Sequence, residues 1–158
     1  MVHTYKYMNI QLDKKQYHTL LTALQTAGFV YGIMGDMVDS KYKKRSKQLD
    51  DLENIVLEHA DEYGMGEFVE IFEGTKYLNE KFMEKVIQDL KEYEDYVFWD
   101  MLAREMAKKE FHTLYTDDEL KQMEERDLLH KIFDLEEKYH EIFEEVGIDN
   151  LELVNYEK

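Results

Sequence analysis

The residues best suited to chemistry lie in the stretch "DLLHKIFDLEEKYHEIFEE", residues 127 to 145. It contains Asp127-x-x-His130 and, ten residues on, Glu137-x-x-His140. A carboxylate and an imidazole three residues apart lie on the same face of a helix, and helical bundles that hold iron or manganese use this spacing. The stretch therefore raises the hypothesis of a metal site.

The helical positions of these residues weigh against a buried metal site. At about 100° per residue, His130, Asp134 and Glu137 fall opposite the apolar side of the helix, and His140 falls at its border. A di-iron bundle needs two inward Glu-x-x-His pairs on different helices, and the sequence has one such pair. We interpret the stretch as a solvated acidic helix face and keep a surface metal site on these four residues as the alternative.

Signatures of enzyme catalysis are missing from the sequence. With no cysteine there is no thiol nucleophile, disulfide or thiolate metal site. The sequence has no G-x-S-x-G, G-x-x-x-x-G-K-[ST], G-x-G-x-x-G or H-E-x-x-H motif. We therefore assign no catalytic residue and no cofactor.

Charge is unevenly distributed along the 158 residues, whose formal net charge is −16. Residues 1–48 carry eight basic and three acidic side chains, whereas residues 49–158 carry 12 and 33, a net charge of −21. Such an acidic body repels nucleic-acid backbones. The basic cluster "KYKKRSK", residues 41–47, is predicted to be a solvated loop; nucleic-acid contact and docking onto an acidic face of a second copy are the alternatives.

The compartment is inferred from apolar runs and from the first residues. No run reaches the roughly 18 to 20 apolar residues that span a bilayer, and the start lacks the apolar block of a signal peptide. We expect a cytoplasmic protein without membrane contact.

The elements predicted around these residues are mainly helical. The complete absence of proline favours long uninterrupted helices. We predict one domain, residues 1–158, that is a bundle of about five helices with minor β structure. The predicted helices lie at 14–38, 46–63, 79–93, 96–111 and 117–146. The predicted β structure is a strand at 5–12, a hairpin within 67–78 and a strand at 150–154.

Individual residues in the sequence predict where helices begin and end and where two helices can approach closely. Asp13 and Thr116 are predicted N-caps, the latter in a Thr-x-x-Glu capping box, and Gly147 is predicted to end the last helix. Gly28 and Gly32, four residues apart, would let another helix approach closely.

The stretch "YEDYVFWDMLAREMAKKEF", residues 93–111, holds the sole tryptophan. Its aromatic and methionine stripe is predicted to be core, with a partner groove as the alternative. The candidate interface residues are Gly28, Gly32, Tyr31 and Trp99.

Three segments carry a resemblance: "QLDKKQYHTLLTALQTAGFVYG", "YEDYVFWDMLAREMAKKE" and "YHEIFEEVGIDNLEL". Together they resemble a family of functionally uncharacterised bacterial proteins. The shared features are patterns of aromatic and aliphatic residues, so the resemblance implies a helical scaffold and no reaction.

The leading functional prediction is a non-enzymatic cytoplasmic protein that acts through protein–protein contacts, including self-association as a homodimer. An alternative is a decoy that imitates the phosphates of DNA and occupies a nucleic-acid-binding protein. A second alternative is a metal-binding protein that uses the carboxylate and histidine residues above.

Overall fold

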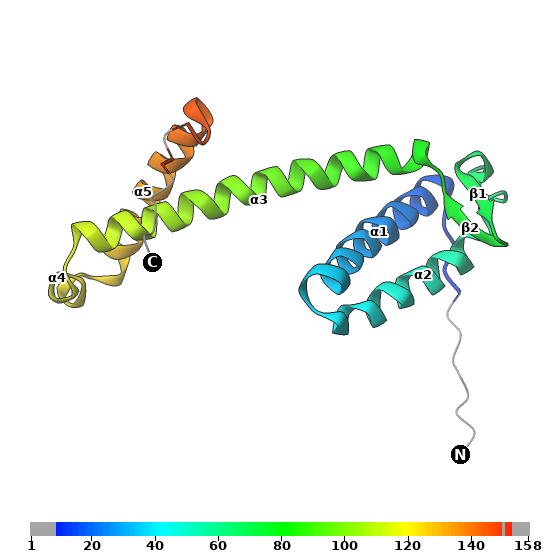
Figure 1. Ribbon diagram of the computed structural model, residues 1–158, viewed down its shortest axis with the longest axis horizontal. Coiled ribbons are helices and arrows are strands. Elements are labelled where there is room, and N and C mark those ends of the chain that lie inside the picture. The colour runs from blue at the N-terminus through cyan, green and yellow to red at the C-terminus, as the bar shows by residue number, and fades with distance from the viewer. Residues whose placement is uncertain (1–8, 150, 153–158) are drawn as a thin grey trace, which may run out of the picture. The chain divides into compact units, whose positions relative to one another are not determined.

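The computed structural model describes residues 9–149 and 151–152, and these are mainly α-helical (Figure 1). This confirms the predicted fold class. Contacts divide the chain into two compact units, residues 1–90 (unit 1) and 91–158 (unit 2). The described helices and strands are α1 (Lys14–Ile33), α2 (Lys43–Leu57), β1 (Val69–Phe72), β2 (Thr75–Leu78), α3 (Glu80–Leu114), α4 (Asp117–Gln122) and α5 (Glu125–Val146).

Unit 1 begins with the predicted cap. The Asp13 carboxylate accepts a hydrogen bond from the Gln16 backbone N–H at 2.9 Å, and the Gln16 side chain accepts one from the Asp13 backbone N–H. After α1 the chain makes a π-helical turn (Met34–Val38) and a short 3-10 helix (Ser40–Tyr42), and then enters α2. The two helices lie side by side (Figure 1).

The turn between α1 and α2 depends on a glycine that the sequence patterns did not single out. Gly35 is buried, and a Cβ there would lie 3.0 Å from Lys43 Cγ and 3.2 Å from the Lys43 backbone nitrogen. In contrast, a Cβ on Gly32 would lie 3.9 Å from the Ser46 hydroxyl, and one on Gly28 would meet nothing within 4 Å. The close approach predicted for Gly28 and Gly32 therefore occurs at Gly35.

The core of unit 1 joins α1, the end of α2, the hairpin and the start of α3. Tyr17 stacks on Tyr63 with ring centroids 4.2 Å apart, and its hydroxyl donates to the Val56 carbonyl at 2.6 Å. The buried members of this core are Tyr17, Leu21, Leu57, Ala60, Met65, Leu78, Phe82, Val86 and Leu90.

The predicted hairpin is confirmed, with Val69 opposite Leu78 and Phe72 opposite Thr75. Its turn places Glu73 and Gly74 at φ 50° and 81°, the positive values that a tight two-residue hairpin turn requires. Asn79 caps the start of α3, because its side chain accepts a hydrogen bond from the Phe82 N–H at 3.2 Å.

Unit 2 comprises the rest of α3, then α4 and α5. The capping box that starts α4 is present, with the Thr116 hydroxyl and the Glu119 carboxylate each accepting from the other's backbone N–H. The apolar side of α5 is half-buried and its Phe143 is buried, while α3 buries Ala103, Ala107 and Phe111. Gly147 ends α5 at φ 58° as predicted.

Several predicted helix boundaries were wrong. The helices predicted at 79–93 and 96–111 are one helix, α3, because no glycine or proline interrupts the helical backbone between them. Conversely, the helix predicted at 117–146 is broken where Met123 and Glu124 adopt extended backbone with ψ near 140°. In addition, α2 runs from Lys43 to Leu57 rather than from 46 to 63, so the basic cluster predicted as a loop is helical from Lys43 on.

The two terminal strands were predicted partly on residues outside the described ones. Within the described part, residues 9–12 and 151–152 form no strand, and residues 5–8, 150 and 153–154 are outside it. The two described strands of the chain are those of the hairpin. Among the described helices, none combines the length and apolar character needed to cross a membrane.

Candidate functional site

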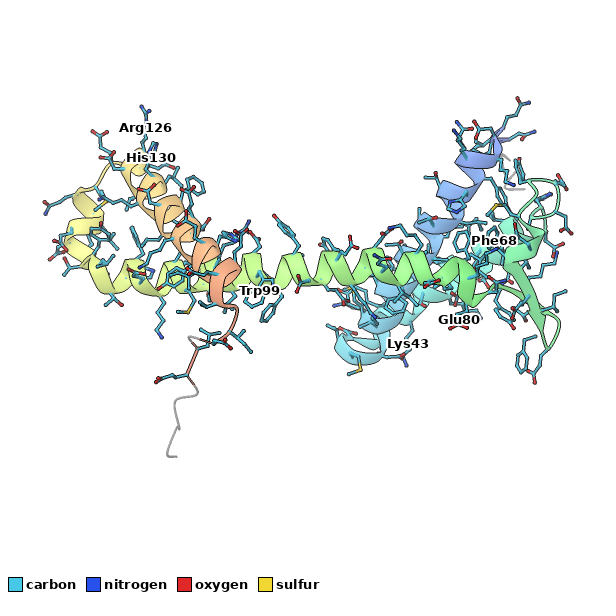
Figure 2. The ribbon with its side chains drawn as sticks, turned by 90° about the horizontal axis from the view of Figure 1, so that it is seen from above. Lys43, Phe68, Glu80, Trp99, Arg126 and His130 are labelled. Carbon is cyan, nitrogen blue, oxygen red and sulfur yellow. The ribbon has the colours of Figure 1, made fainter. Side chains whose placement is uncertain are left out.

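The four metal candidates are not gathered in one place. His130, Asp134 and Glu137 are exposed on α5. His140 instead turns toward α3, where its Nε2 lies 3.6 Å from Asp100 Oδ1. Figure 2 labels His130 near the start of α5 and Trp99 on α3 near the other end of α5. Within residues 9–149 and 151–152, no three His, Cys, Asp or Glu side chains are grouped as a metal ion would require.

Unit 2 instead contains an open pocket of about 490 Å³ where the second half of α5 meets α3. We call it the aromatic pocket. Five of its lining residues come from α3 and three from α5. They are Glu92, Asp95, Tyr96, Trp99, Asp100, His140, Phe143 and Glu144.

Trp99 forms the centre of the aromatic wall and is held on several sides. Its indole N–H donates to Asp95 Oδ1 at 3.2 Å, one helical turn away. The indole lies 5.6 Å from the Phe143 ring, centroid to centroid, and 4.9 Å from the Phe98 ring. A Cβ on Gly147 would lie 3.9 Å from the far edge of the indole. These contacts fix a large aromatic face that is half-buried and still reachable.

The pocket is strongly acidic. Four carboxylates line it, and no lysine or arginine is among the described residues that do. Asp100 is paired with Arg104, whose guanidinium lies 3.1 Å from its second oxygen. Unit 2 as a whole has 21 acidic and nine basic residues, a net charge of −12. Carboxylates around an aromatic face attract organic cations and repel anions.

Polar contacts nearer the start of α5 than the pocket hold this helix against the end of α3. Lys138 Nζ lies 2.7 and 2.8 Å from the two carboxylate oxygens of Glu110, and Lys131 Nζ donates to the Tyr115 hydroxyl at 3.2 Å. The hydrogen bond from Lys138 holds the pKa of Glu110 below its ordinary value. Burial, followed by the hydrogen bond to Glu110, raises the pKa of Tyr139 to about 12. These contacts position Phe143 and Glu144 one turn further along α5.

One candidate interface residue of unit 1, Tyr31, borders a second, apolar groove of about 560 Å³. Tyr31 lines it, and its hydroxyl accepts a hydrogen bond from Arg45 at 3.1 Å while the guanidinium lies over its ring. The full lining is Ala23, Thr26, Ala27, Val30, Tyr31, Met34, Tyr42 and Arg45. Gly28 and Gly32 are not among these residues.

Sequence reasoning singled out Trp99 and, as a metal candidate, His140, but not the other residues that line the pocket. The stripe in residues 93–111 was expected to be core, yet Phe98 and Met101 are 52% and 59% exposed. The acids close to Trp99 in the sequence, Asp95 one helical turn before it and Asp100 directly after it, were an available signal. The contribution of Phe143 and Glu144 could not be read from the sequence, because it depends on where α5 crosses α3.

Comparisons of the chain with protein-family models, curated proteins and solved structures give no match. The resemblance to a family of uncharacterised bacterial proteins thus stays a prediction.

Proposed function

We propose that this chain is a non-enzymatic, cytoplasmic protein that acts through protein–protein contacts and associates with a second copy of itself. The observation that carries the proposal is a row of exposed apolar side chains at the end of α1. We call it the apolar stripe, and it comprises Phe29, Val30, Ile33, Met37 and Val38.

The spacing of the apolar stripe makes it one surface. Phe29, Ile33 and Met37 are four residues apart, so they follow one another along the same side of α1 and its π-helical turn. Met37 is 81% exposed. The stripe adjoins the apolar groove, which Val30 and Met34 also line. Soluble proteins rarely leave contiguous apolar surface of this kind open unless it contacts another molecule.

Self-association is tested by sedimentation velocity over a range of protein concentrations. We expect the wild type to form a larger species as concentration rises, and Met37→Glu to remain monomeric, because the new charge would be buried in the contact. Met101→Glu is the matched control, since it changes an exposed methionine of unit 2. A wild type that is monomeric throughout, or a Met37→Glu variant that associates normally, would refute the proposal.

A second candidate function, the nucleic-acid decoy, is favoured by the solvent side of α5. Five exposed carboxylates fall within one side of this helix: Asp127, Asp134, Glu137, Glu141 and Glu145. They extend over about 27 Å, a length on which one DNA strand carries roughly eight phosphates. The decoy would displace labelled duplex DNA from a basic DNA-binding protein, and Glu137→Gln with Glu141→Gln would weaken it. Failure of the wild type to displace the DNA ends this candidate.

The metal-binding alternative is not proposed further, because His140 is directed to Asp100 while the other three candidates are exposed elsewhere on α5.

A further inference from the structure

We propose that the aromatic pocket of unit 2 receives lysine side chains from the basic segment, residues 41–47, of a second copy of this chain. The inference rests on the proposed self-association and names the site and the residues that would bring two copies together.

The pocket has the chemistry of a cation site. A tryptophan face is the strongest aromatic partner for an ammonium group, and Tyr96 and Phe143 provide further ring surface beside Trp99. Carboxylates at the rim supply opposite charge. A carboxylate accepts several hydrogen bonds, so the bond from the indole leaves Asp95 able to accept another from a lysine. The absence of a metal-holding group among the described residues favours an organic cation over a metal ion.

The size and openness of the pocket suit a chain segment. A volume of about 490 Å³ exceeds what one lysine side chain fills. Tyr96 is exposed, and Tyr93, one turn before it on α3, is exposed as well. The ring surface thus continues beyond the pocket along α3, where residues next to an inserted lysine would lie.

The basic segment offers the complementary group. Lys41 and Lys43 are paired with Asp39 and Asp36, but Lys44 and Lys47 are exposed and have no ion-pair partner among the described residues. The segment opens α2 in unit 1, where Figure 2 labels Lys43. It directly follows the apolar stripe in the chain, so an apolar and basic surface of one copy would meet an aromatic and acidic surface of the other. Because each copy has one segment and one pocket, two reciprocal contacts can close a two-fold dimer.

The first test uses Trp99, the sole tryptophan of the chain, whose fluorescence reports on the pocket. A synthetic peptide of residues 39–48 is titrated into the full-length protein while tryptophan emission is followed. We expect a saturable change that weakens as salt is added. The same peptide with its lysines acetylated should bind at least tenfold more weakly, because acetylation removes the charge. Equal binding of the acetylated peptide would overturn the proposal.

The second test uses charge reversal in the full chain, read by sedimentation velocity. Lys44→Glu and Glu144→Lys should each weaken self-association about tenfold or more, because each places like charges together. Combining the two changes in one chain should restore part of the loss. Lys15→Glu and Glu141→Lys are matched controls outside the proposed contact, and the latter lies one turn before Glu144 on α5. Controls that weaken association as much as the test variants would refute a specific contact.

The two proposals fail in different ways. If Met37→Glu prevents association while Lys44→Glu and Glu144→Lys do not, the chain self-associates without the aromatic pocket, and the inference is wrong. If the wild type is monomeric at every concentration, both proposals are wrong. If an unrelated lysine-rich peptide binds the pocket and the 39–48 peptide does not, the occupant is a different basic protein and the assignment to a second copy is wrong.

Discussion

Tyr17 shows how one polar atom is accommodated in the core of unit 1. Its ring is buried and stacks on Tyr63, and its hydroxyl donates to the Val56 carbonyl. Tyr17→Phe keeps the ring and removes the donor, so we expect the free energy of unfolding to fall by about 1 kcal/mol. Urea denaturation followed by far-UV circular dichroism measures the change. An unchanged midpoint would mean that water satisfies the carbonyl equally well.

The same residue predicts a loss of stability at alkaline pH. Burial, together with the negative charges of ionised Tyr63 and of Glu62, raises the pKa of Tyr17 from 10.0 to about 12. The folded state therefore favours the neutral phenol, and the unfolded chain loses this proton first. The contribution of the neutral Tyr17 phenol to the free energy of unfolding is fully present below pH 10 and is lost as pH rises toward 12. Stability curves across this range should be flatter for Tyr17→Phe than for the wild type.

Single residues were predicted well where their role is local. Asp13, Thr116 and Gly147 each act on backbone groups within a few positions, and the structure confirms all three. The partners of Trp99 depend instead on the crossing of two helices, which periodicity does not specify. Sequence patterns therefore singled out two members of the aromatic pocket, Trp99 as an interface residue and His140 as a metal candidate, and left the others unassigned.

At the scale of elements, alanine substitutions at Gly28 in α1 and at Gly35 in the π-helical turn are expected to change stability in opposite directions. A Cβ on Gly28 would meet nothing within 4 Å, so Gly28→Ala should stabilise the helix by up to about 1 kcal/mol. Gly35→Ala would press a methyl group against Lys43, whose backbone nitrogen cannot move freely, and should destabilise by about 1 to 3 kcal/mol. Thermal unfolding of the two variants beside the wild type compares them directly. A destabilised Gly28→Ala would restore the idea of a close helix contact there.

The boundary errors have a common origin. Residues 94 and 95 were predicted to separate two helices, although the helical backbone continues through them in α3. At Met123 and Glu124 no glycine or proline marks the break. The chain turns there because α5 packs against α3, and such tertiary preferences override local signals.

At the scale of the whole molecule, the two units have separate sets of buried residues. Unit 2 buries Ala103, Ala107, Phe111 and Phe143 among its described residues, fewer than unit 1, and it carries a net charge of −12. We expect it to unfold at a lower urea concentration, because it has less buried apolar surface and more self-repulsion. Trp99 fluorescence reports unit 2, and far-UV circular dichroism reports all helices. Coincident transitions would instead support the predicted single domain.

The position of Leu90 has a consequence for synthesis of the chain. The unit 1 core is complete at this residue, so all its buried side chains leave the ribosome before any of unit 2. Helix formation is slow to nucleate and easy to extend. The start of α3, packed through Phe82 and Val86, therefore provides a formed helical turn to which each later residue of α3 is added. Unit 2 begins its folding on a helix that unit 1 has already started.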